Sequence, residues 1–126
     1  MLGSSPVAAI VPVSDLARAK QFYTEVLGLT VVDDAEVGTE FGSGGGTTLF
    51  VYETPSAGQA QHTVASWTVS DLEAEMAELR SHGITFEEYD MPGLTTENGI
   101  ATAGNIRGAW FKDPDGNILS LGQHVG

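Results

Sequence analysis

The feature that most constrains the fold is an internal repeat. The letters Val-Ser-Asp-Leu at 13–16 return unchanged at 69–72, an offset of 56 residues (13 to 69). Each copy follows an apolar run and precedes a helical pattern, which ends at 28–30 in the first copy and at 83–85 in the second, an offset of 55 (28 to 83). The chain therefore carries two copies of one supersecondary unit.

The two copies differ mainly by an insertion in the second. The last strand-like run opens at Gly46 in the first copy and at Gly116 in the second, an offset of 70 (46 to 116). The 126 residues correspond to one domain, so we expect a single domain over 1–126 whose modules, at about 6–54 and about 62–124, share a core. A polar linker at 54–61 joins them.

Each copy predicts the order β-α-β-β-β. The first helix is expected at 15–27, with Ser14 or Asp15 as its N-cap, and the second begins at a capping box formed by Ser70 and Glu73. The glycine run 42–46 lies between two strands and opens no helix, so it predicts a hairpin turn rather than a phosphate loop. The expected strands are 7–13, 29–32, 37–41, 47–52, 62–69, 84–89, 106–112 and 117–123, and the long segment 90–105 is expected to be a loop.

Charge and composition exclude several classes of function. Seventeen acidic residues against five basic ones give a net charge of −12, which repels nucleic acid and anionic membranes. The charge either attracts a cationic ligand or serves solubility. There is no cysteine and no apolar run of the roughly 18 residues that a membrane span requires, so we expect a cytoplasmic protein without disulfides.

Two further segments complete a family pattern. These are Phe22-Tyr23-x-x-Val26-Leu27-Gly28-Leu29 and the run from Trp110 to Leu119, Trp-Phe-Lys-Asp-Pro-Asp-Gly-Asn-Ile-Leu. With the repeat they resemble the vicinal oxygen chelate superfamily, which includes glyoxalase I, extradiol dioxygenases, and fosfomycin and bleomycin resistance proteins. The resemblance implies an α+β fold in which two βαβββ modules form a curved, partly open mixed sheet, with helices on the convex side and a ligand site in the concavity.

The resemblance also implies where a metal would bind. Metal-dependent members carry ligands in the first and last strand of each module, and the corresponding positions here are Ala8, Phe50, Val64 and Ser120. None offers the imidazole or carboxylate that a divalent cation needs, so we expect no metal and no cofactor. The alternative is a displaced metal held by His62 and His124, with a third ligand from Glu53 or the long loop.

Side chains alternate along a strand, so these four positions also identify the concave face. Hairpin pairing of Lys112 with Asn117 and of Gly42 with Thr47 adds residues from the neighbouring strands, although a slip of one residue would exchange Phe111 for Trp110. The predicted ligand-binding residues are Phe41, Thr48, Phe50, Tyr52, His62, Ser66, Arg107, Phe111 and Ser120. The alternatives are that the large residues fill the space of the lost metal, and that Arg107 only pairs with Glu53 or Glu97.

Two functions remain open at this point. The first is a metal-free protein that binds a small apolar or aromatic molecule, of the sequestration or resistance type. The second is a glyoxalase- or dioxygenase-like metalloenzyme with displaced ligands. We further expect a homodimer that covers the edge strand near Val7, and a loop at 89–105 that folds over the mouth of the concavity through Met91, Leu94 and Ile100.

Overall fold

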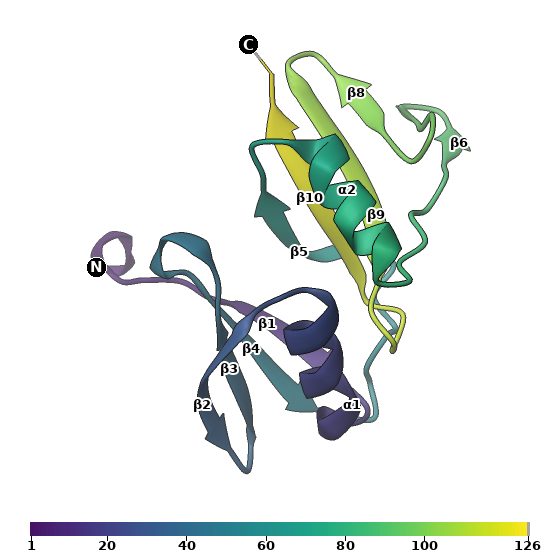
Figure 1. Cartoon of the computed structure of the whole chain (residues 1–126). Helices are drawn as coiled ribbons and strands as arrows, with labels where there is room; N and C mark the ends of the chain where they lie inside the picture. Colours follow the sequence, from purple (N-terminus) through teal and green to yellow (C-terminus); the bar gives the residue numbers. More distant parts are fainter. Residues whose placement is uncertain (126) are drawn as a thin grey trace.

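The computed structural model describes residues 1–125 and forms two four-stranded mixed sheets, each carrying one helix on one face (Figure 1). The first sheet has the order β1-β4-β3-β2, and the second has the order β5-β10-β9-β8. The edge strands β1 and β5 are in contact. This arrangement confirms the predicted α+β fold of two similar modules, module 1 spanning residues 9–53 and module 2 residues 63–124.

The strands of module 1 are β1 (Ala9–Val13), β2 (Thr30–Ala35), β3 (Gly38–Gly42) and β4 (Thr48–Glu53). Those of module 2 are β5 (Thr63–Thr68), β8 (Ala101–Ala103), β9 (Ile106–Lys112) and β10 (Ile118–His124), and a small separate hairpin pairs β6 (Asp90–Met91) with β7 (Leu94–Thr95). The helices are α1 (Leu16–Gln21) and α2 (Leu72–Ser81), and short 3-10 turns occupy Leu2–Ser4 and Gly44–Gly46. No helix in the described part of the chain is long and apolar enough to cross a membrane.

The repeated Val-Ser-Asp-Leu junction ends a strand and caps a helix in both modules. The Asp15 carboxylate accepts a hydrogen bond from the Arg18 amide, and the Asp71 carboxylate accepts one from the Ala74 amide, both at 3.1 Å. These bonds satisfy an amide that lacks a partner in the first helical turn. The predicted capping box of Ser70 and Glu73 was therefore wrong, because Asp71 is the N-cap and the residue three positions later, Ala74, has no side-chain acceptor.

The two helices differ by one residue, which explains the two repeat offsets. In module 1 the helix continues beyond α1 as a π-helical segment, Phe22–Val26, whereas α2 has no such segment. The Leu29 amide donates to the Tyr23 carbonyl across six residues, while the Ile84 amide donates to the Leu79 carbonyl across five. A π turn accommodates one extra residue in a helix, so Tyr23 and Leu79 are equivalent positions and the extra residue follows Tyr23.

The fourth strand of module 2 lies where the sequence predicted a loop. Residues 84–89 were expected to form a strand, but they form none, although the Glu87 amide donates to the Trp110 carbonyl at 2.8 Å. Instead β8 pairs with β9 and occupies the position that β2 occupies in module 1. The insertion in the second copy thus contains both the small hairpin and a replacement strand.

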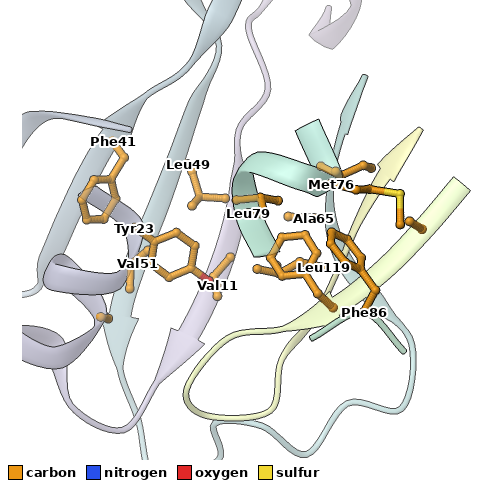
Figure 2. Packing of buried hydrophobic residues seen from close by; sticks show 14 of the residues in the cluster. Val11, Tyr23, Phe41, Leu49, Val51, Ala65, Met76, Leu79, Phe86 and Leu119 are labelled. Atoms are coloured by element: carbon orange, nitrogen blue, oxygen red, sulfur yellow. The ribbon is translucent and has the colours of Figure 1, made fainter. Parts of the chain in front are cut away.

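A single core connects the two modules. The faces of β1, β4, β5 and β10 opposite the concave positions pack beneath the helices, since their alternate residues, such as Val11, Val51 and Leu119, are buried in the core. Figure 2 shows this cluster running from Phe41 and Tyr23 in module 1 to Met76 and Phe86 in module 2. Burial of this apolar surface supplies the main stabilisation of the contact between the modules.

A buried polar contact also joins the modules. The Tyr23 hydroxyl donates to the Asp113 carboxylate at 2.9 Å, and the Asn117 side-chain amide donates to the Pro12 carbonyl at 2.6 Å. Two backbone amides and the Asn117 side chain also donate to the same carboxylate. We call this contact of Tyr23, Asp113 and Asn117 the closed joint.

Candidate functional site

The strand register defines the sheet faces that lie opposite the helices. In module 1, Phe50 pairs with Ile10 on one side and with Glu40 on the other, so these three share one face. In module 2, Ser120 pairs with Ser66 and with Trp110. Directly paired residues point to the same side of a sheet, so these two sets form the concave faces, as opposed to the faces buried beneath the helices.

Three predicted site residues lie on the opposite, helix-packed faces. Phe41 pairs with Leu49 and Phe111 pairs with Leu119, and all four side chains are buried in the core. Arg107 pairs with Gln123 and donates to the Glu73 carboxylate of α2 at 2.7 Å. The prediction that these side chains point into the concavity was wrong because both hairpin registers are shifted by one residue.

The shift arises in the hairpin turns. The Asp113 amide donates to the Asn117 carbonyl at 3.0 Å, so the turn is one residue longer than expected and Lys112 pairs with Ile118. The β3–β4 turn closes in the same way, and Gly42 pairs with Thr48. In consequence Trp110 replaces Phe111 on the concave face, the exchange that a one-residue slip predicts.

Each concave face carries an aromatic side chain that lies against a glycine. A Cβ added to Gly38 would come within 2.6 Å of the Phe50 ring, and a Cβ added to Gly108 would come within 3.4 Å of the Trp110 indole. Both aromatic side chains are half-buried. The glycines therefore allow the two rings to lie close to their sheets and leave the space above them free. Sequence reasoning missed both glycines and Trp110 because it assumed shorter turns.

The polar groups of the concave face are few. The Ser120 hydroxyl donates to the Ser66 hydroxyl at 2.7 Å, and Thr48 and Tyr52 are half-buried in module 1. Glu40 is also half-buried there and was not expected from the sequence. Predicted residue His62 precedes β5, is exposed and contacts the carbonyl of Thr63 at 3.0 Å, so it lies at the end of the face rather than within it.

The long loop of module 2 borders a cavity on the concave face. A cavity of about 330 Å³ is lined by Leu94 of the loop together with Trp110, Ser66 and Ser120 of the sheet. The Tyr89 ring meets Trp110 edge to face, with ring centroids 5.7 Å apart. The loop thus brings an apolar side chain to the same space that the indole of Trp110 faces, and this geometry is typical of a small-molecule pocket.

Glu88 holds the base of this loop. Its carboxylate accepts hydrogen bonds from the Thr96 hydroxyl at 2.6 Å and from the Gly99 amide at 2.9 Å. The Thr96 bond, followed by the Gly99 bond, lowers the pKa of Glu88. The carboxylate therefore remains ionised at neutral pH and links residue 88 to Thr96 and Gly99.

The positions at which metal-dependent members of the superfamily carry their metal ligands hold unsuitable residues in this chain. Ala8, Phe50 and Val64 have no donor atom, and the Ser120 hydroxyl is bonded to Ser66. His62 and His124 lie at opposite ends of the parallel pair β5 and β10, roughly 20 Å apart at the usual rise per residue, so they cannot bind one ion within a chain. Among residues 1–125, no group of three or more His, Cys, Asp or Glu side chains is placed to hold a metal.

Comparison with known proteins agrees with this architecture. An antibiotic binding protein from Streptomyces sp. CB03234, TnmS3, is 25% identical, with 96% of this chain and 98% of that chain covered and a TM-score of 0.71. A glyoxalase/bleomycin resistance protein from the same organism is 28% identical, with 93% and 98% covered and a TM-score of 0.67. A glyoxalase/bleomycin resistance protein from Catenulispora acidiphila is 24% identical, with 95% and 98% covered and a TM-score of 0.70, and shows the shared fold.

A comparison with curated protein sequences gave no match. A family model, in contrast, matches residues 6–121, nearly the whole repeat pattern from which the fold was predicted. The chain therefore belongs to the Glyoxalase/Bleomycin resistance protein/Dioxygenase superfamily.

Proposed function

We propose that this protein binds a planar, largely apolar small molecule on its concave face without a metal, and acts by sequestration rather than by catalysis. The observation that carries the proposal is the Trp110 indole, which lies over Gly108 and lines the cavity beneath Leu94. Flat aromatic surfaces favour offset stacking with planar ligands. The similarity to an antibiotic binding protein supports the same class of function.

The proposed site includes residues of both modules. Phe50, Thr48 and Tyr52 lie on the concave side of module 1, and Ser66, Ser120 and Trp110 on that of module 2. Each aromatic side chain would provide a wall, while the hydroxyl groups would orient the ligand by hydrogen bonds. His62 would contribute only at the rim. Phe41, Phe111 and Arg107 are not part of this proposal because they lie on the helix-packed faces.

A homodimer is part of the proposal. Ile10 is 53% exposed and Val7 is 90% exposed at the edge of the first sheet, beside the half-buried Phe50. Exposed apolar side chains gathered on one surface favour contact with a second copy. Light scattering at micromolar concentration is expected to give a dimer, and a monomer would contradict this part. A cytoplasmic location remains a prediction for cell fractionation.

Binding can be tested with acridine, a planar aromatic probe, by isothermal titration calorimetry. Trp110→Ala is expected to weaken acridine binding about tenfold or more, because stacking on an indole contributes roughly 1–3 kcal/mol. Phe22→Leu, in the helical segment that follows α1 and outside the linings of the described cavities, is the matched control and should leave the affinity unchanged. Equal affinity in wild type and Trp110→Ala would place the site elsewhere.

The metalloenzyme alternative has a separate test. Elemental analysis of protein purified without chelator should give no stoichiometric zinc, nickel, manganese or iron. Stoichiometric metal that disappears in a His62→Ala, His124→Ala double variant would instead favour the enzyme. Since the two histidines cannot meet within a chain, such a site would require two copies.

A further inference from the structure

The two modules contact each other through two equivalent hairpin turns. In the β9–β10 turn the Asp113 amide donates to the Asn117 carbonyl at 3.0 Å, and in the β3–β4 turn the Ser43 amide donates to the Thr47 carbonyl at 2.9 Å. The offset of 70 residues makes Ser43 the counterpart of Asp113. Each turn reaches across to the opposite module, since Asp113 meets Tyr23 and Ser43 accepts a hydrogen bond from the Trp67 indole at 3.2 Å.

The second contact, made by the β3–β4 turn, leaves a space where side chains fill the first contact. We call the contact of Ser43, Trp67 and Leu79 the open joint. Leu79 is the counterpart of Tyr23, but it is shorter and has no hydroxyl to meet the opposite turn. The β3–β4 turn is also poor in side chains, because Ser43 is followed by three glycines. In the closed joint the Tyr23 phenol and the Asp113 carboxylate fill the space between the modules. In the open joint the smaller side chains of Leu79 and Ser43 therefore fill less of the equivalent space.

A cavity of about 500 Å³ lies at the open joint. Its apolar walls come from both modules and consist of Leu27, Leu29, Trp67, Val69, Leu79, Phe111 and Leu121. The glycines at 28, 42 and 44, the hydroxyl-bearing residues Thr30, Ser43 and Thr68, and the exposed Glu75 complete the lining. The volume lies within the usual range of small-molecule sites, roughly 300–1,000 Å³.

This cavity is separate from the concave face. Phe111 and Leu121 belong to the side of the second sheet that packs under α2, whereas Ser120 and Trp110 belong to the other side. The second sheet therefore lies between this cavity and the one that Trp110 lines, and at the edge of β5 a further cavity of about 430 Å³ contacts both Trp67 and Ser66. Binding in the open-joint cavity does not require binding on the concave face, so a site there is independent of the proposed function.

Glu75 gives the cavity its chemical preference. It is the one ionisable side chain in the lining, and within residues 1–125 it forms no ion pair and its carboxylate accepts no hydrogen bond. The net charge of −12 raises the local concentration of cations around the whole molecule. A ligand with an aromatic body and one ammonium group would match both the apolar walls and this carboxylate.

We propose that the open joint is a second binding site, and that it takes a small arylalkylamine. The aromatic body lies between Leu29, Leu79 and Phe111, in the space that corresponds to the phenol of Tyr23 in the closed joint. The ammonium group faces Glu75. Because residues of both modules line the cavity, the bound amine also links the modules at the contact that lacks a buried polar cluster.

The test uses 4-phenylbenzylamine, with its neutral analogue 4-biphenylmethanol for comparison. The two indole N–H groups give two resolved NMR signals, which a Trp110→Phe variant assigns. Titration with the amine is expected to shift the Trp67 signal in a saturable manner, with its own concentration dependence whether or not the Trp110 signal also shifts. An amine that shifts only Trp110, or shifts neither up to its solubility limit, would overturn the proposal.

Four variants sharpen the test. Leu79→Phe, and independently Leu79→Tyr, should fill the cavity and weaken amine binding at least tenfold. Glu75→Gln should weaken binding of the amine about twofold to fivefold and leave the alcohol unaffected, whereas Glu78→Gln, on the same helix but outside the cavity lining, should affect neither. Should both Leu79 variants fail to fold, the Glu75 and Glu78 pair still decides the question. Unchanged amine affinity in Glu75→Gln, or in a folded Leu79 variant, would contradict the site.

Discussion

The closed and open joints are built on the same type of backbone turn but differ in the side chains that fill the contact between the modules. In the closed joint a carboxylate that is buried beside a tyrosine receives four hydrogen bonds, whereas in the open joint an indole donates one bond to a serine and a cavity remains. The difference rests on two equivalent positions, Tyr23 against Leu79 and Asp113 against Ser43. A repeated fold can thus hold its modules together at one contact and keep space at the other.

The largest effect is expected at Asp113. Asp113→Ala removes the shared acceptor of the closed joint and leaves the Tyr23 hydroxyl and the Asn117 amide with unmet donors, so we expect a loss of about 3–5 kcal/mol in the free energy of unfolding. Ser43→Ala, the counterpart in the open joint, should cost only about 0.5–1 kcal/mol. Urea denaturation of both variants measures the contrast. Equal losses would show that the two joints do not differ in strength.

Tyr23→Phe should have the next largest effect. It removes one hydrogen bond to the buried carboxylate and is expected to cost about 1–2 kcal/mol at neutral pH. Tyr52→Phe is the control, since the Tyr52 hydroxyl makes no hydrogen bond within residues 1–125. A loss in the control as large as that in Tyr23→Phe would contradict a special role for the closed joint.

The same tyrosine predicts an alkaline limit. Burial, with the neighbouring Asp113 charge, raises the pKa of Tyr23 far above its ordinary value. The stability it contributes is fully present below the unfolded pKa of about 10 and decreases above it, by about 1.4 kcal/mol per pH unit, because only the unfolded state then loses its proton. Tyr23→Phe should show a flatter decline in unfolding free energy between pH 10 and 11.5. Identical slopes would rule out this linkage.

A smaller effect is expected at Trp67. Trp67→Phe removes the indole donor to Ser43 and should lower the free energy of unfolding by about 0.5–1.5 kcal/mol. The matched control is Trp110→Phe, because the half-buried Trp110 indole has no hydrogen-bond partner among the residues that the structure describes. If both variants lose the same amount, the open joint receives no stabilisation from this bond.

The smallest effect is expected at Arg18. Its guanidinium lies 3.0 Å from the Asp115 carboxylate; the Arg18 side chain is 47% exposed and the Asp115 side chain 7%. The Ser14 amide also donates to this carboxylate at 3.1 Å, so Asp115 keeps a partner when Arg18 is removed. Ion pairs with an exposed partner contribute about 0.2–1 kcal/mol and are weakened by salt, so Arg18→Ala should differ from wild type by about 1 kcal/mol or less at low salt and by less in 1 M NaCl, as measured by thermal unfolding. A loss that persists in high salt would indicate packing rather than charge.

The sequence predicted the fold because its strongest signals are local and repeated. The Val-Ser-Asp-Leu junctions identify both strand-to-helix boundaries, and the apolar alternation of the four central strands assigns their buried faces. The strand expected at 84–89 was wrong because its Phe86 packs into the core without strand pairing, and a later segment pairs with β9 instead.

The candidate site was predicted only in part. Phe50, Thr48, Tyr52, Ser66 and Ser120 lie on the concave faces as predicted, because they follow from the aligned metal-ligand positions and from side-chain alternation within one strand, which does not depend on a turn. Phe41, Phe111 and Arg107 were misplaced because the register of an antiparallel pair depends on how its turn closes. The Asp113 side chain, which binds the amides of Asp115 and Asn117, lengthens that turn, and such bonds are not visible in a hydrophobic pattern.

The π turn after Tyr23 has a consequence for how the two halves diverged. A residue inserted into an α-helix rotates everything after it by about 100°, and one inserted before a strand exchanges that strand's two faces. In module 1 the π turn contains the extra residue, and the next strand, β2, is exposed at all six positions, so neither change disturbs the core. The first half could therefore change its length at this point while Tyr23 kept its contact with the second half, which makes this helix end the place where a length change is tolerated.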